Sequence, residues 1–178
     1  MNPWGGPSVT GEFVVVTGGT ISMDVNLLKG AKGFIAVFDL KTGKPLWTKD
    51  ITGGVVSCAA LAKGSAIVTA TDGKVRAFKI ENGEREWIYE AKATLFAPAA
   101  IAKGTVYAGD LKGVLHAMDL ETGTGAWTLD LGTHKDVQAP GMFFSGPVVQ
   151  SGRLYAATCN LQGPNAQKET VVVCIGDK

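Results

Sequence analysis

Short apolar runs alternate with turn residues along the whole chain. Runs such as Ala66-Ile67-Val68 and Val106-Tyr107-Ala108 each follow a Lys-Gly pair, and a second glycine turn comes a few residues later. The spacing of an amphipathic helix is missing, apart from a weak trace at 22–32 that we interpret as a loop. The pattern therefore predicts short antiparallel strands joined by tight turns, and an all-β fold.

The same pattern returns every forty residues. The recurring positions are Gly33, Gly73 and Gly113; Gly43, Gly83 and Gly123; and Trp47, Trp87 and Trp127. Each unit holds four strands, of which the first is rich in small residues, as at Cys58-Ala59-Ala60-Leu61. Four strands in a period of about forty residues are typical of one blade of a β-propeller.

Counting strands gives about four blades in a single propeller segment. They are expected at roughly 2–50, 51–91, 92–131 and 132–178. The last unit supplies three strands and lacks its outer one, together with the tryptophan of that strand. A blade cannot bury both of its faces alone, so neighbouring blades must stack on each other.

The repeated Ala/Val-x-Asp-x-x-Thr-Gly-x-x-x-Trp motif resembles the pyrroloquinoline-quinone-type, or tryptophan-docking, propeller repeat. This family includes quinoprotein dehydrogenases and the lipoprotein of the barrel-assembly machinery. The motif is complete at Asp39 to Trp47 and at Asp119 to Trp127, whereas the second copy has Lys79 and Asn82 at the Asp and Thr positions. The resemblance implies a ring of seven or eight blades, of which this chain would form half.

The resemblance also implies structural roles for the repeated motif positions. Trp47, Trp87 and Trp127 are expected to dock flat between two blades, beside turns that contain Gly43, Gly83 and Gly123. An open half-ring would expose two apolar faces, which favour association. A second copy of the chain, or missing N-terminal blades, would then complete the ring.

Composition excludes several classes of function. The 178 residues carry 17 basic and 16 acidic side chains, a net charge of +1, so no nucleic-acid partner is expected. The longest nearly apolar run, residues 93–102, is too short to span a membrane. No signal peptide is visible at the N-terminus, so a periplasmic or extracellular location rests on the family resemblance alone.

Catalytic motifs are hard to find in this sequence. Phosphate-binding loops and nucleophile elbows are missing. His116 is expected to be a plain strand residue and not a metal ligand, because Ala36 and Arg76 occupy the same repeat position. Cys58, Cys159 and Cys174 are expected to be small buried side chains. Catalytic quinoproteins combine adjacent cysteines with a quinone and calcium. The chain has no Cys-Cys pair, so we expect no cofactor, and enzyme activity is uncertain but disfavoured.

Three loops depart from the forty-residue rule and should crowd one face of the propeller. They lie at 18–32, 130–144 and 160–169, and binding residues concentrate on such variable loops. The candidate partner-binding residues are Asp24, Asn26, Leu27, Leu28, His134, Lys135, Asp136, Met142, Phe143, Phe144, Asn160, Gln162 and Asn165. Met142 to Phe144 either anchor a partner or pack under their own loop.

The sequence therefore favours a non-catalytic propeller that acts as a protein-interaction scaffold through its long-loop face. The first alternative is half of a quinone-dependent oxidoreductase that uses pyrroloquinoline quinone and calcium. The second is a propeller that binds a small ligand or a sugar. The repeat motif specifies the fold and does not choose among these functions.

Overall fold

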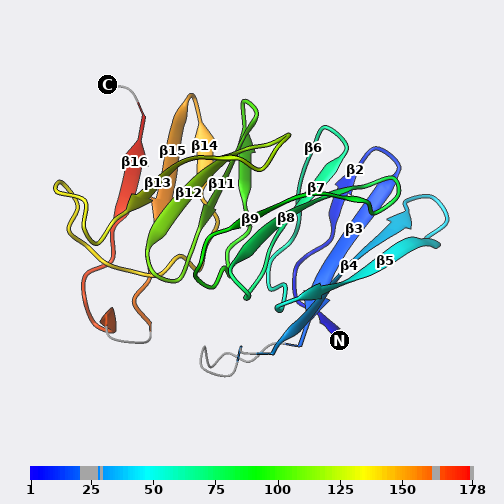
Figure 1. The fold of residues 1–178 in the computed structure, drawn as a ribbon, viewed down its shortest axis with the longest axis horizontal. Helices are drawn as coiled ribbons and strands as arrows, with labels where there is room; N and C mark the ends of the chain where they lie inside the picture. The colour runs from blue at the N-terminus through cyan, green and yellow to red at the C-terminus, as the bar shows by residue number, and fades with distance from the viewer. Residues whose placement is uncertain (21–27, 29, 162–164, 177–178) are drawn as a thin grey trace.

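The computed structural model describes residues 1–20, 28, 30–161 and 165–176. The described residues form sixteen strands in four antiparallel sheets, which lie side by side along the long axis of the molecule (Figure 1). The described residues contain no α-helix. The all-β prediction and the stack of propeller blades are both confirmed.

Each sheet collects strands that are consecutive in the sequence. The first contains β1 (Asn2–Pro3), β2 (Ser8–Thr10), β3 (Phe13–Gly19), β4 (Lys32–Asp39) and β5 (Pro45–Thr52). The second contains β6 (Ala60–Ala62), β7 (Ser65–Thr69), β8 (Lys74–Lys79) and β9 (Arg85–Glu90). The third contains β10 (Ala100–Ala102), β11 (Thr105–Gly109), β12 (Val114–Asp119) and β13 (Gly125–Asp130). The fourth contains β14 (Val148–Gln150), β15 (Arg153–Ala157) and β16 (Val172–Ile175).

The turns explain why these strands pair in one register. Lys63-Gly64, Lys103-Gly104 and Ser151-Gly152 have positive φ at both residues. Two such residues form the tight turn whose twist matches that of an antiparallel hairpin. Each of the first three sheets also has one bulge in the pairing of its last two strands. The bulge follows Val37 in β4, Ala77 in β8 and Ala117 in β12.

The core lies between successive sheets. Because neighbouring side chains of a strand point to opposite faces, each sheet has a forward face toward the next sheet and a rear face toward the preceding one. Val75 and Ala77 lie on the forward face of the second sheet and pack in one cluster with Met118 and Leu120 on the rear face of the third. Equivalent clusters fill the other two junctions.

Candidate binding site on the long-loop face

The long-loop face is the end of the stack where each second strand turns into the third and each outer strand leads to the next sheet. In the first two sheets its described residues include 30–32, 52–54 and 70–73, which are linked by backbone hydrogen bonds. Gly53 N donates to Ala31 O at 2.9 Å, and Thr71 N donates to Gly54 O at 2.9 Å. These bonds hold the loops of two neighbouring sheets together.

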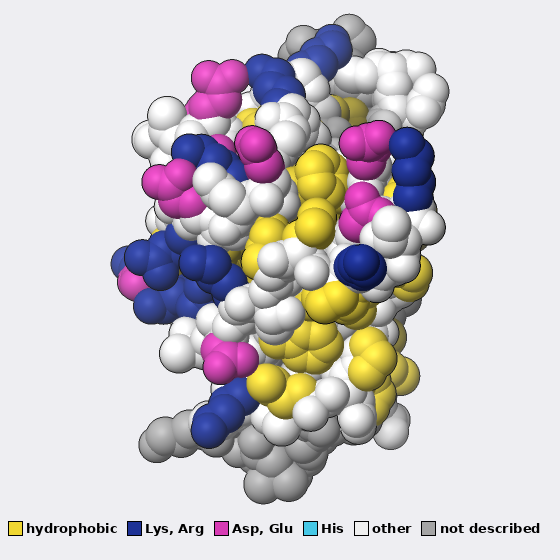
Figure 2. All heavy atoms as spheres, turned by 90° about the vertical axis from the view of Figure 1, so that its right-hand side faces the viewer, with side chains coloured by type: hydrophobic (Ala, Val, Ile, Leu, Met, Phe, Trp, Pro, Cys, Tyr) yellow, Lys and Arg dark blue, Asp and Glu magenta, His cyan; other side chains and the backbone are white. Residues whose placement is uncertain are grey.

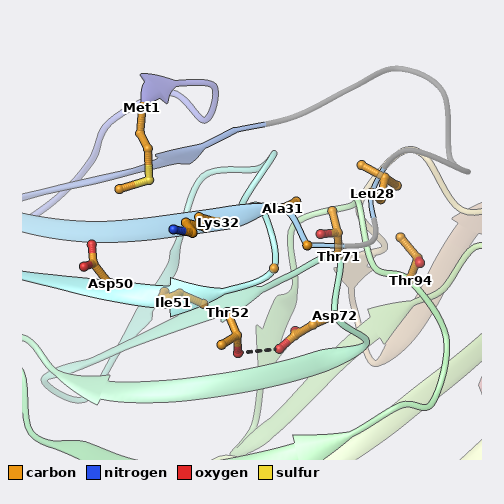
Figure 3. Close-up of a pocket in the computed structure, with 12 residues that line it drawn as sticks. Met1, Leu28, Ala31, Lys32, Asp50, Ile51, Thr52, Thr71, Asp72 and Thr94 are labelled. Atoms are coloured by element: carbon orange, nitrogen blue, oxygen red, sulfur yellow. Dashed lines mark hydrogen bonds between the residues drawn. The ribbon is translucent and has the colours of Figure 1, made fainter.

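A pocket of about 930 Å³ opens on this face, between the first and second sheets (Figure 3). Lys32 and Asp50 come from β4 and β5, and Thr52 ends β5. The second sheet contributes Thr71 and Asp72 from the turn between β7 and β8. The pocket thus has an apolar lining with a few hydroxyl and carboxylate groups, as small binding clefts usually have.

An ion pair fixes one wall of this pocket. The Arg76 guanidinium donates from Nη1 to Asp72 Oδ1 at 3.1 Å and from Nη2 to Asp72 Oδ2 at 2.5 Å. Nη2 also donates to Thr52 Oγ1 at 2.9 Å, and that hydroxyl donates to Asp72 Oδ2 at 2.9 Å. A planar guanidinium suits such two-pronged binding of a carboxylate. Because Arg76 is buried, this contact ties β8 rigidly to the end of β5.

The other two long loops brace each other across the third and fourth sheets. Cys159 N donates to Met142 O at 2.8 Å, and Met142 N donates to Cys159 O at 3.2 Å. The Asn160 side chain donates from Nδ2 to the carbonyls of Pro140, Lys168 and Glu169 at 3.0–3.3 Å. Asn160 therefore braces the loops through its Nδ2 atom, whereas its Oδ1 atom is buried with no hydrogen-bond partner among the described residues.

The remaining predicted binding residues fall into three groups. Asp24, Asn26, Leu27 and Gln162 lie outside the described residues. Leu28 is buried and contributes to the wall of the large pocket. His134, Lys135, Asp136 and Asn165 lie on the surface or are half-buried.

His134 and Asp136 belong to a second pocket, of about 540 Å³, between β13 and β16. The backbone N–H of Asp136 donates to His134 Nδ1 at 3.3 Å, so the two residues form a local turn contact. The lining of this pocket is largely apolar and includes Trp127, Leu129 and Ile175. His134 and Asp136 lie at its edge and do not converge on the large pocket.

The Met142 to Phe144 segment packs inward. Phe143 is fully buried against Gly109, where a Cβ atom would lie 2.5 Å from the phenyl ring. Phe144 makes an edge-to-face contact with Phe96, with ring centroids 5.6 Å apart. Of the two interpretations offered by the sequence, packing under its own loop fits Phe143. The side chain of Phe143 cannot reach a partner.

Sequence reasoning missed a buried polar chain at the junction of the second and third sheets. Tyr89 Oη lies 3.0 Å from His116 Nδ1, and His116 Nε2 lies 3.1 Å from Asp110 Oδ2. His116 lies on β12, where the sequence predicted a strand residue, but both His116 and Asp110 are buried. Burial first, and then the charge of Asp110, raises the pKa of the Tyr89 hydroxyl above its usual value. No short-range motif could have indicated this site, because Tyr89 comes from the neighbouring sheet.

The tryptophans of the first two sheets contact the sheet that follows. Trp47 Nε1 donates to Ile80 O at 2.7 Å, and Trp87 Nε1 donates to Leu120 O at 2.9 Å. A Cβ atom on Gly83 would lie 2.8 Å from the Trp47 ring, and one on Gly123 would lie 2.6 Å from the Trp87 ring. These glycines leave space for the indole. By contrast, Trp127 is 38% exposed, whereas Trp87 is 7% exposed.

The described cysteines, histidines and carboxylates do not gather into a metal-binding cluster. Within the described ranges, no three His, Cys, Asp or Glu side chains lie close enough to share a metal ion. All three cysteines are free; Cys58 and Cys159 are half-buried. Cys174 is exposed on β16, so the prediction that it is buried is wrong.

The four stacked sheets and their tryptophan contacts define a β-propeller segment. The sequence profile described as outer membrane protein assembly factor BamB matches residues 3–175, so the chain belongs to this family of PQQ-type repeat proteins. A comparison with curated proteins gives no match. No helix long and apolar enough to cross a membrane occurs in the described part of the chain.

Solved structures with the same fold include a BamB protein, an alcohol dehydrogenase and a designed protein. BamB from Moraxella catarrhalis is 25% identical, with a TM-score of 0.68 over 88% of this chain and 44% of its own. Quinohemoprotein alcohol dehydrogenase ADHIIG from Pseudomonas putida HK5 is 17% identical, with a TM-score of 0.74 over 99% of this chain and 33% of its own. The computationally designed Ika4 protein is 17% identical, with a TM-score of 0.68 over 96% of this chain and 88% of its own. The chain thus spans less than half the length of BamB.

Proposed function

We propose that this chain is a non-catalytic propeller segment that binds a protein or peptide partner on its long-loop face. The observation that supports this proposal is the open pocket of about 930 Å³ between the first two sheets. Its exposed side chains of opposite charge, Lys32 and Asp50, can select the register of an extended peptide that carries both charges. Its apolar lining can take one large side chain of that peptide.

The pocket wall formed by Asp72 and Thr52, which Arg76 holds in place, favours binding in a preformed shape. Buried and doubly hydrogen-bonded groups do not reorganise when a ligand arrives, so little ordering entropy is lost at this wall. The same reasoning applies to the two loops held by Asn160. We therefore expect a rigid binding platform in which Trp47, Trp87 and their partner glycines serve as docking residues between blades.

The family gives this proposal a cellular setting. BamB is described as an outer membrane protein assembly factor. By analogy, we propose a periplasmic location for this chain and a partner that takes part in outer-membrane protein assembly. An extended segment of a β-barrel polypeptide has the alternating apolar and polar side chains that the pocket can accommodate.

A direct test uses labelled peptides of about ten residues that tile the strands of an outer-membrane β-barrel protein. Binding is measured by fluorescence anisotropy for the native chain and for the variants Lys32→Glu and Asp50→Lys. Lys41→Glu, an exposed charge in the turn between the third and outer strands on the opposite face, is the matched control. We expect the two pocket variants to weaken binding by about tenfold, and the control by less than about twofold. Equal affinity for all four proteins would refute the proposed site.

Thr52, Thr71 and Thr94, together with Asp72, also favour a second candidate ligand, a small polyhydroxylated molecule. Binding on a glycan array that is lost in Thr94→Val would support this candidate. Stoichiometric uptake of pyrroloquinoline quinone with calcium, seen as a spectral change, would instead favour the oxidoreductase alternative and exclude a purely scaffolding role.

A further inference from the structure

The turn between β8 and β9 differs from the corresponding turns of the first and third sheets. Thr42 and Thr122 precede the motif glycines in those two turns, whereas Asn82 precedes Gly83 in the second. Asn82 is the only asparagine in the sequence that is followed by glycine. Because glycine has no Cβ atom, the side chain of a preceding asparagine can approach its backbone nitrogen closely. The Asn82-Gly83 pair is therefore a candidate site for spontaneous chemistry between a side chain and the backbone.

The polar side chains of this turn are exposed to water. Glu81, Asn82 and Glu84 are exposed, whereas Gly83 between them is buried. Figure 2 shows a similar division over the neighbouring end of the molecule, where charged side chains lie at the margins of a hydrophobic strip. Water can therefore reach the Asn82 amide, and a small molecule released from it can diffuse away.

Packing between the first two sheets explains why the second residue of the pair is glycine. Gly83 has a φ of +72°, and a Cβ atom at this position would lie 2.8 Å from the Trp47 ring. A left-handed backbone conformation and a contacting indole both disfavour a larger residue. The reactive dipeptide is therefore avoided only by a different residue at position 82, such as the threonine of the other two turns.

The Asn82 side chain is bound to the backbone of its own turn. Glu84 N donates a hydrogen bond to Asn82 Oδ1 at 2.9 Å. Such a bond polarises the amide carbonyl and stabilises the negative charge that develops on Oδ1 when a nucleophile adds to Cγ. The electrophilic carbon of Asn82 is thus activated in the folded chain.

The nucleophile, by contrast, is restrained. Gly83 N donates to Lys79 O at 2.9 Å, and Lys79 N donates to Glu84 O at 2.8 Å. The exposed side chains of Lys79 and Glu84 form an ion pair at 2.7 Å, and the Trp47 indole covers Gly83. The Gly83 nitrogen is therefore free to reach Asn82 Cγ only when the turn opens locally.

We infer that Asn82 is a site of spontaneous deamidation and that opening of the β8–β9 turn controls its rate. In the open turn, Gly83 N loses its proton to water and bonds to Asn82 Cγ, while the Cγ–Nδ2 bond breaks and Nδ2 leaves as ammonia with a proton from water. A water molecule then opens the cyclic imide at one of its two carbonyls, which gives aspartate or isoaspartate. The reaction consumes one water molecule, releases one ammonia molecule and needs no oxidant or reductant. It is independent of any ligand in the long-loop pocket.

The two products should affect the first junction differently. Aspartate adds a negative charge to an exposed turn, and its carboxylate can still accept the hydrogen bond from Glu84 N. Isoaspartate leads the main chain through the side chain of residue 82 and lengthens the turn by one methylene. The longer turn cannot keep both the Gly83–Lys79 hydrogen bond and the position of Gly83 under Trp47. We therefore expect isoaspartate, and not aspartate, to loosen the contact between the first two sheets.

The first experiment incubates the purified 178-residue chain at mildly alkaline pH, both native and unfolded in urea. Peptide mass spectrometry measures the replacement of the amide NH₂ by OH at every asparagine. Asn82 should be the main site in both samples and should react about tenfold more slowly in the native chain, because at least one hydrogen bond of the turn must open. Equal rates in the two samples would refute control by the turn. No reaction at Asn82, or faster reaction at another asparagine, would refute the site itself.

The repeat provides a matched control for the reactive residue. Asn82→Thr places in the second turn the residue that the first and third turns contain at this position, Thr42 and Thr122. This variant should retain the circular dichroism spectrum of the native chain and release no ammonia from this turn. Undiminished ammonia release by the folded variant would contradict the assignment to Asn82.

Two tryptophan variants distinguish opening of this turn from a general loss of stability. Trp47→Ala uncovers Gly83, whereas Trp87→Ala removes an indole that covers Gly123 in the next junction. Deamidation of Asn82 should be at least about threefold faster in Trp47→Ala than in Trp87→Ala. Circular dichroism verifies that both variants keep their β-structure. Equal rates in two folded variants would contradict gating by the cover over Gly83.

The predicted effect on the junction is tested on the isolated products. Chromatography separates the isoaspartate form from the native chain, and urea unfolding compares the two with Asn82→Asp, which adds the charge on a normal backbone. The isoaspartate form should unfold at a lower urea concentration than both of the others. If the isoaspartate form unfolded at the same urea concentration as the native chain, the proposed link between this turn and the docking of Trp47 would be wrong.

Discussion

The two tryptophans of β9 and β13 occupy the same repeat position in very different surroundings, and this predicts unequal contributions to stability. Trp87 is 7% exposed, donates a hydrogen bond to Leu120 O and lies against Gly123. Trp127 is 38% exposed and makes a tilted contact with Tyr107, with ring centroids 6.0 Å apart. Replacing each with alanine compares one docked indole with one that is partly docked.

The magnitudes follow from the area that each indole removes from water. A buried tryptophan covers roughly 150–250 Å², and truncation of such a residue to alanine costs about 3–5 kcal/mol. Trp127 leaves more than a third of its surface in water, so its truncation should cost about 2–3 kcal/mol. Trp87→Ala should therefore be the more destabilising change by about 1–2 kcal/mol.

Urea unfolding followed by far-ultraviolet circular dichroism measures both losses without relying on tryptophan fluorescence. The titrations are run at two protein concentrations, so that any contribution from association is separated from the stability of the fold. Trp87→Phe serves as a control that keeps an aromatic ring but removes the indole N–H, and it should cost about 1–3 kcal/mol. Equal losses for Trp87→Ala and Trp127→Ala would refute the link between docking geometry and stability.

Three further predictions follow from the turns and from the polar junction. Gly123→Ala should destabilise the fold by about 1–2 kcal/mol more than Gly43→Ala, because both glycines have positive φ but only Gly123 faces an indole; thermal unfolding measures the difference. The Thr42 hydroxyl and backbone N–H lower the pKa of Asp39 in the folded chain. Asp39 therefore stabilises the fold fully above about pH 3.8, and this contribution is lost as the pH falls through the lower folded-state pKa. If Asp39→Asn and the native chain lost stability equally on acidification, this prediction would be contradicted. The raised pKa of Tyr89 gives a contribution that is complete below about pH 10 and is lost as the pH rises through the folded-state pKa; Tyr89→Phe should lack this alkaline loss in unfolding experiments between pH 9 and pH 12.

The fold could be predicted because every blade packs against its neighbour through apolar residues at the same repeat positions. Apolar residues at one spacing must fill each junction, so the forty-residue period carries the sheet order, the turns and the strand register. The motif also located the tryptophans and the glycines. It could not predict that Trp127 is partly exposed, because exposure depends on the neighbouring sheet and not on the repeat itself.

The candidate site was less accessible to sequence reasoning, for two physical reasons. Phe143 lies 48 residues after its counterpart Leu95, because the preceding loop is longer, so a fixed period hides its role in the core. Aligning Pro147-Val148 with Ala99-Ala100 and counting backward would have found it. His116 and Arg76 each also contact a residue of the preceding sheet, Tyr89 and Thr52, and pairs between sheets leave no local pattern in the sequence.

These non-repeating polar residues help to explain how a repeated sequence keeps its blades in order. Apolar faces of similar shape could pair in several ways, whereas a buried charge is stable only beside its own partner. At the first junction, Arg76 pairs with Asp72 of its own sheet and donates a hydrogen bond to Thr52 of the preceding sheet. At the second junction, His116 contacts Asp110 of its own sheet and Tyr89 of the preceding sheet. The two junctions therefore contain different polar contacts. Exchanging the second and third sheets would leave both groups without their partners from the preceding sheet.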